Sequence, residues 1–122
     1  MKGEFQKVYS KKYTGWGKCY LYAYAEGNIT EEEEPIPDSV FFEITWFGGC
    51  LAGPEPPILW YVAEACLQDY DGVKKYYCSR LEEVTCDIMD EACWAYIKFC
   101  VKKGDEVTVL AKEWVLVEEF EG

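Results

Sequence analysis

Cysteines are the residues of this 122-residue chain with the most evident chemistry: there are seven, and no histidine accompanies them. Cys86, Cys93 and Cys100 follow one another at intervals of seven residues. Seven residues are two turns of an α-helix, so the spacing predicts a helix with all three on one face. Neighbouring members would lie about 10.5 Å apart, beyond the ~7 Å that a disulfide allows between Cα atoms. Any bridges from this helix should therefore run to the other cysteines, which are Cys19, Cys50, Cys66 and Cys78.

Three uses of the cysteines are open at this point. We favour intramolecular disulfides, three of which would tie the helix to other segments and leave one cysteine free or bridged to a second chain. Buried free thiols, which pack as small hydrophobic groups, are the alternative. Metal binding is disfavoured, because the chain has no C-x-x-C pair and cysteines spaced along one helix cannot converge on an ion. We expect no metal and no cofactor.

Three residues are candidates for catalysis. Cys50 lies on a glycine-rich turn, FGGCLAG, where a nucleophile could be presented, but the chain has no histidine to act as its base. Glu43 and Glu64 interrupt apolar stretches, where burial would raise the pKa of a carboxyl group and suit it to acid–base chemistry. The plainer interpretation is a turn that carries half of a disulfide, and two carboxylates on solvent-facing sides. A small enzyme using Glu43, Glu64 or Cys50 is therefore an alternative to a non-enzymatic protein.

Acidic residues dominate the charge of the chain, which is −11. This charge argues against direct nucleic-acid binding and favours a basic protein partner. On the predicted helix, one side collects carboxylates that could occupy the basic groove of a nucleic-acid-binding protein: Glu83, Asp87, Asp90 and Glu91. The plainer interpretation is a solvated helix face. Our preferred hypothesis is an acidic, non-enzymatic interaction protein that engages a basic partner.

Residue usage points to a hot environment. The chain has one Asn and two Gln, eleven Lys against one Arg, and seventeen Glu. This is the composition of hyperthermophile proteins, whose intracellular members also carry disulfides. We expect a protein from a hyperthermophilic archaeon or its virus. Without an apolar secretion signal or a stretch of membrane-spanning length, it should be intracellular, in the host cytoplasm. A disulfide-stabilised virion or structural protein is a further alternative.

Local patterns predict the elements of a single domain covering residues 1–122. Alternation predicts strands at 18–26 and 39–47, the TGWG motif a turn at 14–17, and EEEEPIP a solvated loop within 26–38. Proline and glycine positions, together with a capping box at Ser79 and Glu82, predict helices at about 58–72 and at 80–103. On the first strand Tyr20, Tyr22 and Tyr24 share a face. Such a face is either core or an interface, and it favours a homodimer.

The C-terminal stretch KKGDEVTVLAKEWVLVEEF, residues 102–120, resembles the middle of an SH3-like barrel sequence. In that family a KGD turn precedes an alternating strand, and a Trp opens the next strand. The resemblance implies two strands with a turn near 111–113, and it transfers no binding residues. Taken together, the elements predict an α+β fold. It would be a small, mostly antiparallel sheet of four to six strands, packed on one side by two helices, the second long and disulfide-linked to the rest.

Overall fold

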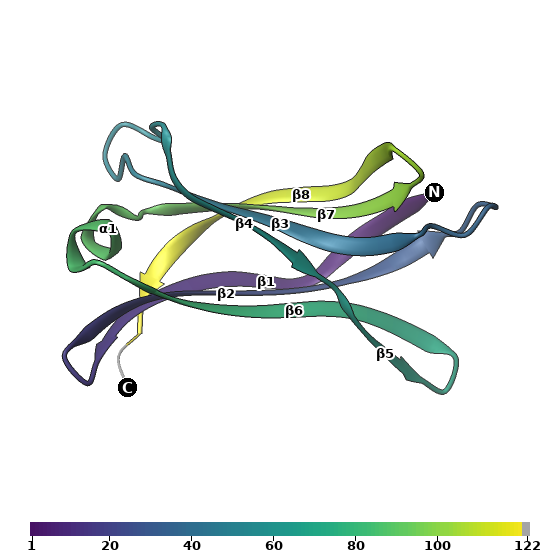
Figure 1. Cartoon of the computed structure of the whole chain (residues 1–122), viewed down its shortest axis with the longest axis horizontal. Helices are drawn as coiled ribbons and strands as arrows, with labels where there is room; N and C mark the ends of the chain where they lie inside the picture. Colours follow the sequence, from purple (N-terminus) through teal and green to yellow (C-terminus); the bar gives the residue numbers. More distant parts are fainter. Residues whose placement is uncertain (121–122) are drawn as a thin grey trace.

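The computed structural model describes residues 1–120 and consists of eight β-strands and one short helix (Figure 1). All eight strands belong to one curled sheet with the order β4-β3-β7-β8-β1-β2-β6-β5. The elements along the chain are β1 (Lys2–Gly15), β2 (Lys18–Glu31), β3 (Ser39–Phe47), β4 (Pro57–Glu64), β5 (Cys66–Tyr70), β6 (Val73–Val84), α1 (Cys86–Glu91), β7 (Trp94–Lys103) and β8 (Glu106–Glu119).

The curl of the sheet brings its two halves into two layers. Strands β4, β3, β7 and the first part of β8 form the upper layer in Figure 1, and β1, β2, β6 and β5 form the lower one. Strand β8 bends from the first layer to the second, where its end pairs with β1 in parallel at residues 10–12 and 117–119. Every other strand pairing is antiparallel.

The core lies between the layers and combines small residues on one side with large ones on the other. Strand β2 points Leu21, Ala23 and Ala25 inward, and all three are fully buried. Opposite them, β3 and β7 supply most of the largest buried side chains: Phe42, Ile44, Trp46, Ile97 and Phe99. Because side chains alternate along a strand, the tyrosines of β2 point outward.

Ser10 is the one buried polar residue among residues 1–120, and its hydroxyl is fully hydrogen-bonded. The Trp46 indole N–H donates to the Ser10 hydroxyl at 3.0 Å, and that hydroxyl donates to the Tyr22 carbonyl at 2.8 Å. Ser10 is 1% exposed, so these bonds satisfy groups that water cannot reach. They also tie the strands β3, β1 and β2 together across the two layers.

The predicted α+β class is wrong, because neither long helix exists. The segment predicted as a helix at about 58–72 contains β4 and β5, which lie at opposite edges of the sheet, and Pro57 begins an edge strand rather than a helix. A proline is tolerated there because the first residue of an edge strand has no need of a ladder hydrogen bond. The run ILWYV that follows is rich in residues that favour strands over helices.

The predicted helix at 80–103 divides into three elements. Its first residues complete β6, residues 86–91 form α1, and residues 94–103 form β7. Ser79 and Glu82, the supposed capping box, lie in β6, and the true N-cap is Thr85, whose hydroxyl accepts from the Ile88 amide at 3.3 Å. Strand β7 alternates buried and outward residues, which is a period of two rather than 3.6.

Other local predictions are confirmed in part. The strand at 39–47 has the predicted bounds, the strand at 18–26 continues to Glu31, and the turn at 14–17 joins β1 to β2. The KGD turn is present between β7 and β8. The turn near 111–113 is wrong, because β8 is continuous there and only a register shift interrupts its pairing with β7. Within residues 1–120, no helix has the length and apolar character needed to cross a membrane.

Candidate interaction surfaces

Two disulfides flank the only helix that the structure describes between residues 1 and 120. Cys19 of β2 is bonded to Cys86, the first residue of α1, and Cys50 is bonded to Cys93, two residues beyond the helix end. Both pairs have Cα atoms 5.2 Å apart, which is ordinary for a disulfide. The prediction of disulfides is therefore confirmed. As predicted, each bridge joins one cysteine of the seven-residue series to one of the other four cysteines.

The third predicted bridge is absent, since Cys100 is free along with Cys66 and Cys78. The prediction failed because Cys86, Cys93 and Cys100 do not share a helix face. Cys86 lies in α1, Cys93 follows it, and Cys100 lies in β7, where it pairs with Phe41 of β3 and Val109 of β8.

Free thiols should fall into two classes of reactivity. Cys66 is exposed on β5, whereas Cys78 and Cys100 are buried. Burial raises the pKa of Cys78 to about 12 and that of Cys100 to about 11, so both remain protonated at pH 8. We expect iodoacetamide to add one group to the folded protein at pH 8 and three to the unfolded, unreduced protein, as counted by intact mass.

A Cys66→Ser variant is the control for this thiol count, and it should lower both numbers by one. Seven adducts on the unfolded, unreduced protein would mean that neither disulfide forms. One adduct would mean that a third disulfide joins two of the cysteines that are free in this structure.

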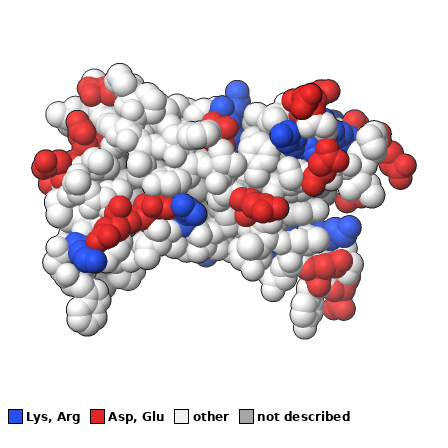
Figure 2. Space-filling view, in the orientation of Figure 1, with Lys and Arg blue, Asp and Glu red and all other residues white. Residues whose placement is uncertain are grey.

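The disulfide-flanked helix carries most of the acidic surface predicted from the sequence, although not on one long helix. Asp87, Asp90 and Glu91 lie in α1, and Glu83 lies at the end of β6, next to the helix. All four are exposed, and Glu83 forms an ion pair with Lys18 at 3.1 Å. We call these four residues the acidic end. Figure 2 shows acidic side chains at the end of the molecule where α1 lies in Figure 1, and others at the opposite end.

The candidate catalytic residues occupy two unrelated places. Glu43 and Glu64 line one broad, open hollow of about 610 Å³ on the outer side of β3 and β4, together with Lys102 and Val107. Glu43 lies 3.8 Å from the Lys98 ammonium group, as a partner in an ion pair. The sulfur of Cys50 is bonded to Cys93 and is not a thiolate. Among residues 1–120, no group of three or more Cys, Asp or Glu side chains is arranged to hold a metal ion.

The predicted tyrosine face exists on the outer side of β1 and β2. Tyr9 stacks on Tyr24 at 5.4 Å and Tyr13 stacks on Tyr20 at 5.0 Å between ring centroids. With Tyr22, these rings form what we call the tyrosine face. A hollow of about 460 Å³ on it is lined by Tyr9, Lys11, Tyr13, Tyr22 and Phe120. The Lys11 ammonium group lies 5.8 Å from the Tyr9 ring and 5.5 Å from the Phe120 ring, within the range of cation–π attraction.

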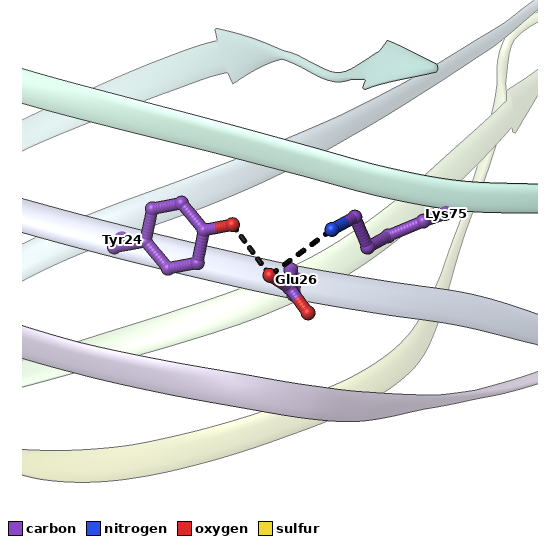
Figure 3. Close-up of polar contacts among 3 residues, drawn as sticks. All are labelled: Tyr24, Glu26 and Lys75. Carbon is purple, nitrogen blue, oxygen red and sulfur yellow. Dashed lines mark hydrogen bonds and ion pairs between the residues drawn. The ribbon is translucent and has the colours of Figure 1, made fainter. Parts of the chain in front are cut away.

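One side of the tyrosine face ends in a hydrogen-bonded triad (Figure 3). The Tyr24 hydroxyl donates to Glu26 Oε1 at 2.6 Å, and the Lys75 ammonium group lies 3.4 Å from the same oxygen. The bond from Tyr24 and the charge of Lys75 lower the pKa of the Glu26 carboxyl group. The pKa of Tyr24 is raised, mainly by burial and also by the same hydrogen bond. The triad joins β2 to β6 and holds the Tyr24 ring in place.

A second aromatic surface covers the outer side of β4, β3, β7 and β8, and the sequence analysis did not identify it. Trp114 of β8 stacks on Tyr96 of β7 at 4.4 Å with ring planes 3° apart, and it lies 4.9 Å from Phe47 and 6.5 Å from Trp94. We call this outer side the tryptophan face. The signal for it was the alternation within WAYIKFCV, in which Ala95, Ile97 and Phe99 are buried and the residues between them point outward.

Comparison of the chain with protein-family models, with curated proteins and with solved structures gave no match, so the surfaces described above are the basis for any functional conclusion.

Proposed function

We propose that this chain is a non-enzymatic interaction protein that engages a basic partner through its acidic end. The observation that carries the proposal is the position of the two disulfides, one at each side of the segment that contains Asp87, Asp90 and Glu91. A six-residue helix has little stability by itself. The disulfides attach this one to β2 and to the loop after β3, so the backbone that carries its carboxylates is held in place.

The ordered helix and the net charge of the chain both favour binding of a basic partner. Less conformational freedom is lost when a partner binds an element that is already ordered. The charge of −11 also attracts a basic partner over a distance and speeds its association. Lys18 beside Glu83 is the one cation that forms an ion pair with the acidic end among residues 1–120. Most of its carboxylates therefore have no ion-pair partner within the described chain.

Two alternative functions have weaker support. An enzyme using Glu43 and Glu64 would have to work in an open hollow where Glu43 is paired with Lys98, and one using Cys50 would first require reduction of its disulfide. A virion or structural role fits the two disulfides and the aromatic outer faces. It does not use the charge of the acidic end.

The proposal is tested with an oligolysine peptide as the basic probe and two variants of equal net charge. One variant neutralises the acidic end: Glu83→Gln, Asp87→Asn, Asp90→Asn and Glu91→Gln. The other neutralises four exposed acids in or beside the β5–β6 and β7–β8 turns, at the opposite end of the molecule (Figure 1): Asp69→Asn, Asp71→Asn, Asp105→Asn and Glu106→Gln. Affinity is measured by titration calorimetry at low and at physiological salt.

We expect the acidic-end variant to bind the peptide about tenfold more weakly than the parent protein at low salt, and the matched variant to lose about twofold. All affinities should fall as salt rises, because charges that face solvent are screened. Equal losses in both variants would show that the peptide responds only to net charge, and they would refute the acidic end as the binding surface.

A further inference from the structure

The tryptophan face exposes many large apolar side chains to solvent, although such side chains are normally buried. Six large apolar residues on it are between 42% and 58% exposed: Trp60, Val62, Val107, Val109, Trp114 and Leu116. Trp60, Trp114 and Leu116 lie beside the half-buried rings of Phe47, Trp94 and Tyr96 at one end of the face. The three valines lie in and beyond the neighbouring row, which also holds Glu43, Lys98 and Lys112. Apolar patches of this kind on a folded protein mark sites that are covered by another molecule.

The charge of this face differs from that of the whole chain. Strand pairing places two carboxylates, Glu43 and Glu64, and three ammonium groups, Lys98, Lys102 and Lys112, on the same outer side. The chain as a whole carries −11, so its remaining surface is strongly acidic. Two copies of this protein repel each other over most of their surfaces, and the tryptophan face is a large apolar region where that repulsion is absent.

The charges are also arranged so that the face is complementary to itself. The carboxylates lie on β4 and β3, and the ammonium groups lie on β7 and β8. When two such faces pack with a two-fold axis parallel to the strands, β3 of one copy lies opposite β7 of the other, and β4 lies opposite β8. The acidic half of each face then meets the basic half of its partner.

From this arrangement we infer that a second copy of the chain covers the tryptophan face, in a two-fold symmetric, face-to-face dimer. Residues that share a row across the strands meet in this geometry. Glu43 and Lys98 are paired across β3 and β7, so Glu43 of each copy faces Lys98 of the other. Trp60 and Trp114 share another row through Thr45 and Tyr96, so these tryptophans also meet across the axis. The dimer leaves the acidic end free, so this inference is independent of the proposed function.

Sedimentation velocity over a range of concentrations tests the inference directly. The parent protein should sediment at about 28 kDa, which is twice its mass of 14.1 kDa. Trp114→Glu places a charge within the aromatic cluster of the face, where Trp114 stacks on Tyr96, and should give a monomer. Leu81→Glu is the matched control, because Leu81 is 49% exposed on β6 in the other layer, and it should leave the dimer intact. Circular dichroism of each variant checks that it is folded.

Charge-reversed variants test the two-fold geometry. Lys98→Glu places four carboxylates at the axis of the dimer and Glu43→Lys places four ammonium groups there, so each variant alone should be monomeric. Mixed in equal amounts, they restore two opposite-charge pairs across the interface and should form a heterodimer of about 28 kDa. Chains with these single changes carry different net charges, so ion-exchange chromatography separates the heterodimer from either variant alone.

A parent protein that stays monomeric at millimolar concentration would overturn the inference. A dimer that survives Trp114→Glu but is lost in Leu81→Glu would place the interface on the other layer, and would also overturn it. Failure of the mixed variants to associate would refute the two-fold pairing of Glu43 with Lys98.

Discussion

Replacing Cys19 and Cys86 by alanine is expected to lower the free energy of unfolding by about 4 kcal/mol. The two residues are 67 positions apart in the chain, and in the chain-entropy model a cross-link that closes a loop of this length removes about that much freedom from the unfolded state. The disulfide joins β2 to the start of α1, two elements that are far apart in the chain and would otherwise be held together only by noncovalent contacts. Urea denaturation followed by tryptophan fluorescence, under oxidising conditions, measures the change.

The matched control is Cys78→Ala, which removes a buried cysteine that has no disulfide. This variant reports the cost of losing a buried sulfur, which we expect to be about 1 kcal/mol. An equal loss in the double variant and in the control would show that the cross-link itself contributes nothing. Reduction of the parent protein should have a larger effect than the double variant, because it also opens Cys50–Cys93, which spans 43 residues. The two closed loops overlap, so their effects are not expected to add.

The sequence predicted individual strands better than it predicted the fold. Residues 39–47 alternate apolar residues on one face with mixed residues on the other, and β3 has the predicted bounds. Residues 94–101 alternate in the same way, but the interval of seven between the cysteines suggested a helix instead. A spacing of seven residues fits two helical turns, but a strand can also contain residues at that spacing. In a strand it would put successive cysteines on opposite faces, so it could not by itself distinguish the two structures.

Residue type would have resolved this ambiguity. Strand β7 begins with Trp, Ala, Tyr and Ile, and β4 contains Ile, Leu, Trp, Tyr and Val, which are mostly β-branched or aromatic. Strand β1 was missed because its lysines and glutamine read as a polar segment, although Val8 and Ser10 point into the molecule. The pairing of β1 with the end of β8 joins residues more than 100 positions apart, and no local pattern predicts such a contact.

The candidate surfaces were predictable to different degrees. Alternation alone places Tyr20, Tyr22 and Tyr24 on one face, but the sequence could not decide whether that face points into the core or outward. That decision depends on Ala23 and Ala25, whose small side chains turn out to face the large residues of the other layer. The tryptophan face could not be predicted without the sheet order, because it is assembled from two pairs of strands, β3 with β4 and β7 with β8, that are separated along the chain.

Phe99→Ala is expected to cost about 3–5 kcal/mol of folding free energy, as is usual when a fully buried phenylalanine is truncated. Phe99 has no exposed surface, and its ring stacks on Phe42 with a centroid distance of 5.0 Å. Phe41→Ala is the matched control on the outer side of β3, where the half-buried ring lines an open hollow, and it should cost about 1 kcal/mol. Thermal and urea unfolding of both variants measure the difference.

The same ring explains why β2 has a glycine at position 27. A Cβ atom on Gly27 would lie 2.8 Å from the Phe99 ring, closer than real Cβ atoms approach a neighbour, and 3.1 Å from the Glu4 carbonyl oxygen, which is a tight contact. Gly27→Ala alone should therefore destabilise the protein by about 1–3 kcal/mol through overpacking. Gly15→Ala, in the same hairpin, meets nothing closer than 3.9 Å and should have little effect. In the double variant Gly27→Ala/Phe99→Ala, the new methyl group enters the space that the ring vacated, so the combined loss should be smaller than the sum of the two single losses. Strict additivity would mean that Phe99 and Gly27 are not in contact, and that the close packing of large against small residues between the layers does not hold at this position.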